Sequence, residues 1–143
     1  IRKYYPDAAI TTDVIVGYST ETDEDFAESV AFCRKVEFSD IHCFPYSVRQ
    51  GTAGARLKKL PDEVKKDRLN QLLQVKAELK SAYIDKHLGK TLNVIPEEIE
   101  DGYVVGYTEN YIRVFLKGEM KNGEFKVVLK QPFKDGALAE YVG

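Results

Sequence analysis

The pattern of the sequence changes near residue 90, and this change constrains the fold more than any other feature. Up to about residue 88, strand-like runs alternate with helix-like segments. From residue 90 onward, five short strand-like runs are separated by turns such as "EDG" and "KDG". Alternation predicts an α/β arrangement, whereas closely spaced short strands predict a small antiparallel barrel. We therefore expect two domains, residues 1–88 and 89–143.

The first part reads as a β-α-β unit. Residues 9–17, "AITTDVIVG", form a β-branched run typical of a strand buried on both faces of a parallel sheet. Thr22 is placed to cap the next helix, which begins with three acidic residues. A second strand is expected over residues 40–47, with a right-handed crossover between the two. We expect the ring of His42, within that strand, to make a hydrogen bond in the core.

A long helix is predicted over residues 61–88. Pro61 suits its first position, and Gly89 is the expected left-handed cap at its end. The residues expected on its packed face are Leu69, Leu72, Leu73, Lys76, Leu79 and Tyr83. This helix would lead directly into the strand-rich part.

Composition narrows the class of protein. A net charge of −2 over 143 residues predicts neither nucleic-acid nor membrane binding, and no apolar run is long enough to span a bilayer. Cys33 and Cys43 are spaced unlike common metal ligands, so we expect buried thiols in a cytoplasmic protein. The chain begins "IRKYY" without methionine, which we interpret as the end of an upstream helix in a larger polypeptide.

Two stretches could bind a small ligand. "GYSTET", residues 17–22, follows the first strand, and ligands of α/β sheets lie beyond such strand ends. Its glycine, hydroxyls and helix amides could receive an oxyanion, although a capped helix after a tight turn explains the residues equally well. In residues 42–52, Phe44 and Tyr46 could line the plane of an aromatic base, and Arg49 could pair with a carboxylate or phosphate. Sheet packing explains the two aromatics as readily.

The strand-rich part carries candidates for RNA binding. Aromatic side chains alternate with polar ones in "YVVGYTENYIRVFLKG", and such a face can stack unpaired bases. The candidate residues are Tyr107, Asn110, Tyr111, Arg113 and Lys117. Residues 91–143 nevertheless hold six Lys/Arg and nine Asp/Glu, a net charge of −3. An RNA module this acidic must gather its cations on one face or bind weakly.

These segments together resemble a known family. "TTDVIVG", "ETDEDF", "IHCFPYSVRQGTAGARL", "IPEE" and "VGYTENYIRVFLKG" are similar, in this order, to the C-terminal half of radical S-adenosylmethionine methylthiotransferases. The subgroup that modifies threonylcarbamoyladenosine in bacterial tRNA is the best match. The resemblance covers nearly the whole chain.

The resemblance implies a fold. Residues 1–88 would be the closing part of a radical S-adenosylmethionine (β/α) barrel, and residues 89–143 would be a five-stranded RNA-binding TRAM barrel. The intact enzyme would use S-adenosylmethionine and [4Fe–4S] clusters. The cofactor-site residues expected here are Gly17, Ser19, Thr20, Glu21, Thr22, Phe44, Tyr46, Ser47 and Arg49.

The chain also departs from the family pattern. Ser19 and Thr20 replace the usual Pro-Gly, which alters the expected turn. The CxxxCxxC motif that holds the cluster is absent. We therefore expect no catalytic residue, metal or cofactor bound in this fragment, and no activity from it alone. Strands of half a barrel expose edges, so we also expect self-association through residues 1–60.

The function expected from the resemblance is methylthiolation of carbon 2 of threonylcarbamoyladenosine beside the tRNA anticodon. The partners would be the anticodon stem-loop and the missing N-terminal domains of the same polypeptide, with no membrane. The first alternative is a related enzyme acting on isopentenyladenosine in tRNA or on a ribosomal protein. The second is a non-enzymatic RNA-binding β-barrel.

Overall fold

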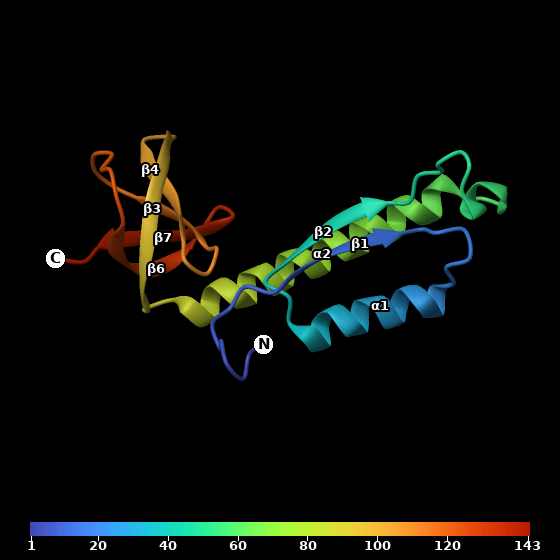
Figure 1. Ribbon diagram of the computed structural model, residues 1–143, viewed down its shortest axis with the longest axis horizontal. Helices are drawn as coiled ribbons and strands as arrows, with labels where there is room; N and C mark the ends of the chain where they lie inside the picture. Colours follow the sequence, from blue (N-terminus) through green and yellow to red (C-terminus); the bar gives the residue numbers. More distant parts are fainter. The chain divides into compact units, whose positions relative to one another are not determined.

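The computed structural model describes residues 1–143 and divides into two compact units (Figure 1). One unit comprises residues 10–80, and the other comprises residues 1–9 and 81–143. The division falls within helix α2 (Asp62–His87), which contributes to both. Each unit has its own hydrophobic core. The expected domain limit at residues 88–89 stays a prediction.

The unit of residues 10–80 contains the predicted β-α-β arrangement. Strand β1 (Thr11–Val16) pairs in parallel with β2 (Asp40–Pro45), and α1 (Asp23–Val36) connects them. Phe26 and Cys33 of α1 pack into a core with Ile41 of β2 and Leu72 of α2. A short 3-10 helix, η1 (Ala53–Arg56), lies between β2 and α2.

Strand β1 is not buried on both faces, and this expectation was wrong. Val16 is buried against the helices, whereas Ile15 on the opposite face is 59% exposed and Phe44 of β2 is 48% exposed. His42 is also exposed, so its ring does not lie in the core. Both helices contribute to one core, and nothing within this unit covers the other face of the two strands. A continuous apolar run therefore occurs here on a sheet that is covered on one side only.

Helix α2 has the predicted extent to within one residue at each end, and its packed face is the predicted one except at a single position. Leu72 and Val75 are buried, Leu73 is largely exposed, and Arg68 is buried although it is charged. Gly89 follows the helix with φ +80° and donates its N–H to the carbonyl of Leu129 at 2.8 Å. A left-handed glycine thus ends the helix as expected.

The unit of residues 1–9 and 81–143 is built on a closed five-stranded barrel. Its strands are β3 (Thr91–Glu100), β4 (Tyr103–Thr108), β5 (Arg113–Leu116), β6 (Phe125–Phe133) and β7 (Gly136–Tyr141). Around the ring they follow the order β3-β4-β5-β7-β6, and β6 pairs again with β3. The interior is filled by apolar side chains that include Val94, Val104, Val114, Leu116, Val127 and Leu129. All five predicted strands are present.

The barrel is not wholly antiparallel, which corrects one expectation. Four of its pairings are antiparallel, but β5 and β7 run parallel. The reason is geometric. Strand direction must alternate around an antiparallel ring, and a ring of five strands cannot alternate completely. One parallel pairing is therefore unavoidable once five strands close.

Candidate functional site

The loops after β1 and β2 lie together. The strands are in register, with Val16 opposite Pro45, and the amide of Tyr46 donates to the carbonyl of Val16 at 2.8 Å. The rings of Tyr18 and Tyr46 meet edge to face with centroids 4.9 Å apart. The structure therefore brings residues 17–22 and 44–47 to one end of the sheet. Parallel strands require this arrangement, because their carboxyl ends share an edge.

The backbone of Gly17 is held by Glu21, whose carboxylate forms an ion pair with Arg68. Gly17 adopts φ +81° and donates its N–H to Oε1 of Glu21 at 2.9 Å. The same oxygen lies 2.7 Å from Nη1 of Arg68, which comes from α2. Although burial opposes it, hydrogen bonds to Asp23 and Glu21 raise the pKa of Arg68. Glu21 therefore fixes the shape of the loop.

The start of α1 supplies its own hydrogen-bond acceptors. The Thr22 side chain accepts from the amide of Asp25 at 3.1 Å, and Asp25 accepts from the amide of Thr22 at 2.9 Å. These bonds from Thr22 lower the pKa of the Asp25 carboxyl. Two amides that could have received an oxyanion are thus satisfied within the helix cap. The role of helix cap therefore accounts for the hydrogen bonds of both the Thr22 side chain and the Thr22 amide.

The other residues expected in the cofactor site differ in what they offer. The Ser19 hydroxyl is buried and has no hydrogen-bond partner. Tyr46 packs against Tyr18, and its hydroxyl lies where a side chain on Gly54 would otherwise be. The exposed residues of the set are Thr20, Phe44, Ser47 and Arg49. An unpaired buried hydroxyl beside exposed polar and aromatic groups is compatible with a polar ligand at this end of the sheet.

The structure contains no set of side chains suited to hold an iron–sulfur cluster. No group of three or more His, Cys, Asp or Glu is arranged to bind a metal ion. Cys33 is buried and Cys43 half-buried, and both are free thiols. Burial raises the pKa of both thiols, which disfavours the thiolate that a metal requires.

A pair of tyrosines stands out on the barrel. The rings of Tyr107 and Tyr111 lie with centroids 5.1 Å apart and planes 33° from parallel. Tyr107 is 37% exposed and Tyr111 is 74% exposed. Large aromatic side chains that remain exposed beside each other offer a surface on which an unpaired base can stack. We call these two residues the tyrosine pair.

Asn110 lies between the two tyrosines in the sequence, but its side chain lies inside the turn and not on the surface of the barrel. Its side chain is buried, and its Oδ1 accepts a hydrogen bond from the Thr108 hydroxyl at 2.7 Å. The Thr108 hydroxyl in turn accepts from the amide of Ile112 at 2.9 Å. Asn110 therefore holds the turn through its Oδ1, while its buried Nδ2 has no hydrogen-bond partner, and its expected contact with RNA stays a prediction.

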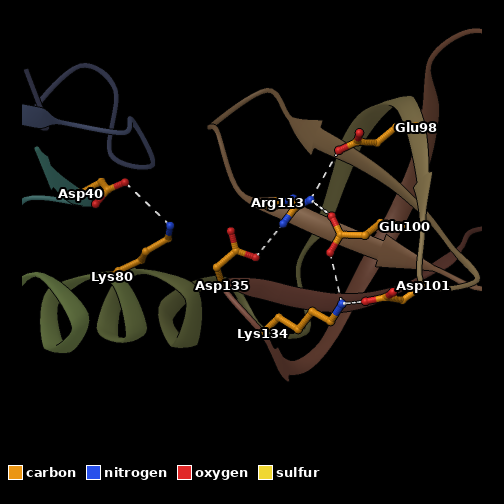
Figure 2. A network of polar contacts seen from close by, with 8 residues as sticks. All are labelled: Asp40, Lys80, Glu98, Glu100, Asp101, Arg113, Lys134 and Asp135. Carbon is orange, nitrogen blue, oxygen red and sulfur yellow. Dashed lines mark hydrogen bonds and ion pairs between the residues drawn. The ribbon is translucent and has the colours of Figure 1, made fainter.

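Arg113 is occupied by carboxylates. Figure 2 shows its guanidinium between Glu98, Glu100 and Asp135; the Asp135 contact is 3.0 Å and the Glu98 contact 3.4 Å. The hydrogen bond to Glu100 is the main reason that the pKa of Arg113 is raised. The side chain is only 17% exposed. Carboxylates thus engage the Arg113 guanidinium in this structure, and its expected contact with RNA stays a prediction.

Nearby positive charge is likewise limited. Lys134 bridges Glu100 and Asp101, at 3.2 and 2.6 Å (Figure 2). Lys117 is exposed beyond the end of β5. The carboxylates around Arg113 outnumber the two cations that contact them, so this part of the barrel is acidic. Any RNA contact here would depend on stacking more than on charge.

Sequence reasoning missed two residues that organise these sites. Arg68 is buried at a core position of α2, four residues before Leu72 and seven before Val75, and that helical spacing was the available signal. Tyr83 was expected on the packed face of the helix, but its hydrogen bond to the carbonyl of Asn110 at 2.7 Å was not foreseen. No local pattern reveals a contact across 27 residues.

None of the helices combines the length and apolar character needed to cross a membrane.

Comparisons with known proteins give the family. No protein-family model matches the chain. It is 40% identical to threonylcarbamoyladenosine tRNA methylthiotransferase MtaB of Bacillus subtilis, over 99% of this chain and 34% of that protein. It is 40% identical to tRNA-2-methylthio-N(6)-dimethylallyladenosine synthase of Aliarcobacter butzleri, over 82% of this chain and 28% of that protein.

A third relative acts on a protein. The chain is 36% identical to ribosomal protein uS12 methylthiotransferase RimO of a Thermotoga species, over 92% of this chain and 32% of that protein. The chain spans about a third of the length of the curated relatives it matches. Identity of this degree over nearly the whole chain confirms the resemblance seen in the motifs. The chain belongs to the methylthiotransferase family that these relatives represent.

Proposed function

We propose that the chain is part of a tRNA-modifying enzyme that methylthiolates carbon 2 of threonylcarbamoyladenosine beside the anticodon. The observation that carries the proposal is 40% identity over 99% of the chain to a methylthiotransferase named for that nucleoside. In this proposal residues 1–88 close a radical S-adenosylmethionine barrel, and residues 89–143 are its TRAM domain. A tRNA substrate would place the enzyme in the cytoplasm.

The barrel would contribute RNA binding through the tyrosine pair. Two exposed rings 5.1 Å apart support stacking of an unpaired base, such as a base of an anticodon loop. The acidic surroundings of Arg113 do not favour phosphate contacts there. Binding by this unit would therefore depend only weakly on salt, compared with modules that track the phosphate backbone.

The other unit would contribute one wall of the cofactor site. In this proposal Ser19, whose buried hydroxyl is unpaired, and Phe44, whose ring is exposed, would contact S-adenosylmethionine at the strand ends. Bound to a [4Fe–4S] cluster held elsewhere in the polypeptide, this cofactor would supply the methyl group and the hydrogen-abstracting radical. Glu21 and Arg68 would keep the loop in shape. The chain alone would be inactive, because its sequence lacks the CxxxCxxC motif that holds the cluster.

Nucleoside mass spectrometry tests the proposed substrate. In a strain lacking the gene, tRNA should lose 2-methylthio-threonylcarbamoyladenosine and keep its other methylthio nucleosides. Restoring the intact gene should restore the nucleoside. Loss of methylthio-isopentenyladenosine, or of a modification on a ribosomal protein, would assign the substrate of one of the other two relatives instead. Unchanged nucleosides and protein would leave only the non-enzymatic RNA-binding function.

A further inference from the structure

The hydroxyl of Tyr83 reaches the turn that carries Tyr111. Tyr83 lies in the last turns of α2, within the barrel unit. Its hydroxyl is 2.7 Å from the carbonyl oxygen of Asn110 and 3.1 Å from that of Asp7. One hydroxyl proton serves these two acceptors, and the shorter contact is to Asn110. Asn110 immediately precedes Tyr111.

Tyr111 adopts a backbone conformation that needs outside support. Its φ is +65°, in the left-handed region that a bulky residue rarely occupies. The turn is fixed at Thr108, whose hydroxyl donates to Asn110 and accepts from Ile112. Ile112 is buried while Tyr111 is exposed, so the turn points the tyrosine ring outward. Strained conformations of this kind persist only where surrounding contacts determine them.

The N-terminal segment that contacts the Tyr83 hydroxyl is itself held in place. Lys86 donates to the carbonyl of Pro6 at 3.2 Å, and Lys90 pairs with Asp7 at 3.0 Å. Nε2 of the buried His87 lies 3.5 Å from the same carboxylate. These contacts keep residues 6 and 7 against the end of α2. The hydroxyl is therefore held at the turn rather than free in solvent.

We propose that Tyr83 is a positioning residue for RNA binding: by holding the carbonyl of Asn110 it keeps the ring of Tyr111 beside that of Tyr107. This inference rests on the proposed stacking function of the tyrosine pair. It concerns a residue that does not itself touch RNA. It also makes the end of α2 part of the RNA-binding apparatus of the barrel.

A double-mutant cycle on the full chain tests the inference. The probe is a fluorescently labelled RNA hairpin with a single-stranded loop, and the measurement is its Kd by anisotropy. Tyr83→Phe should weaken binding by about 3- to 10-fold, the usual effect of one lost hydrogen bond. Tyr111→Ala should weaken it at least as much, because it removes the stacking surface. In the Tyr111→Ala background, Tyr83→Phe should have no further effect.

Tyr141→Phe is the matched control. The Tyr141 hydroxyl is buried in the same barrel unit and has no hydrogen-bond partner, so its removal costs no bond. Its Kd should equal that of the unchanged chain. As a second readout, nuclear Overhauser contacts between the rings of Tyr107 and Tyr111 should weaken in Tyr83→Phe and persist in Tyr141→Phe. This measurement needs no ligand.

The outcomes separate the inference from the function on which it rests. If Tyr111→Ala leaves the Kd unchanged, the stacking function itself fails. If Tyr111→Ala weakens binding and Tyr83→Phe does not, only the positioning role is overturned. Equal losses from Tyr83→Phe in both backgrounds would mean a general structural effect and would also overturn it. Persistent ring contacts in Tyr83→Phe would do the same.

Discussion

Arg68 Nη1 lies 2.7 Å from Glu21 Oε1, and the same oxygen accepts the amide hydrogen of Gly17 at 2.9 Å. The side chains of Arg68 and Glu21 are only 6% and 12% exposed. A helix residue thus determines the conformation of the loop after β1, although 47 positions separate it from Glu21. Contacts within the chain thus hold the loop in shape, so that the proposed binding of a ligand there would require little further ordering.

Replacing Arg68 should strongly destabilise the unit of residues 10–80. Arg68→Ala leaves the Glu21 carboxylate buried without its cation, and such losses typically cost about 3–5 kcal/mol. Urea denaturation followed by circular dichroism measures the change. Arg34→Ala is the control, because Arg34 and its partner Glu78 are both more than half exposed. That change should cost less than about 1 kcal/mol, and equal costs for the two variants would contradict the expectation.

Stability at alkaline pH should depend on Tyr83. Burial, and then the charge of Asp7, raises the pKa of Tyr83 from 10.0 to about 12. A raised folded-state pKa means that the stabilisation is complete below pH 10 and is lost as the pH rises toward 12. The Tm of the unchanged chain should therefore fall more steeply over this range than that of Tyr83→Phe. Tyr4→Phe, at an exposed position, should behave like the unchanged chain; parallel curves for all three would refute the assignment.

Arg113 and Lys117 should affect RNA binding and stability in opposite ways. Arg113→Ala removes the cation shared by Glu98, Glu100 and Asp135, so the Tm should fall by several degrees while the salt dependence of RNA binding stays nearly constant. Lys117→Ala, at an exposed site, should leave the Tm almost unchanged. If Lys117 meets a phosphate, the slope of log Kd against log salt should drop by about 1. The reverse pattern would show that Arg113 reaches the RNA.

The uncovered face of β1 and β2 should drive self-association of this chain. Ile15 and Phe44 are 59% and 48% exposed, and the outer edge of each strand is unpaired. Sedimentation velocity should detect oligomers at concentrations above micromolar. The Ile15→Lys, Phe44→Ser double variant should shift the chain toward monomer. Phe32→Ser, on α1 at a site 60% exposed, is the control and should change the distribution little. A chain that is monomeric throughout would exclude this prediction.

Features fixed by neighbours in the sequence could be predicted. The Thr22 cap, the left-handed Gly89 and the five barrel strands follow from short patterns, and the structure contains each of them. The meeting of residues 17–22 with residues 44–47 follows from the parallel-strand rule. These cases need only local chemistry or one general rule of topology.

Features fixed by distant partners could not be predicted. The ion pairs of Arg113 could not be foreseen, because its carboxylate partners come from β3 and from the turn after β6. The exposed face of β1 depends on which elements are present to cover it, and β-branched residues read alike in either case. The parallel pairing of β5 with β7 follows from ring closure, which no single strand encodes. Whether a side chain at a site is free to bind a ligand is therefore harder to predict than the backbone structure of the site.

The place of β7 in the ring has a consequence for how the barrel forms on a ribosome. It is the last of the five strands to be synthesised, yet it lies between β5 and β6 and pairs with both. Until it emerges, the nascent β3–β4–β5 meander has no way to close, and β5 keeps an open edge. Two seams, β3–β6 and β5–β7, must then join strands that are not consecutive in the chain. Closure of those long loops, rather than formation of the hairpins, should limit the folding rate.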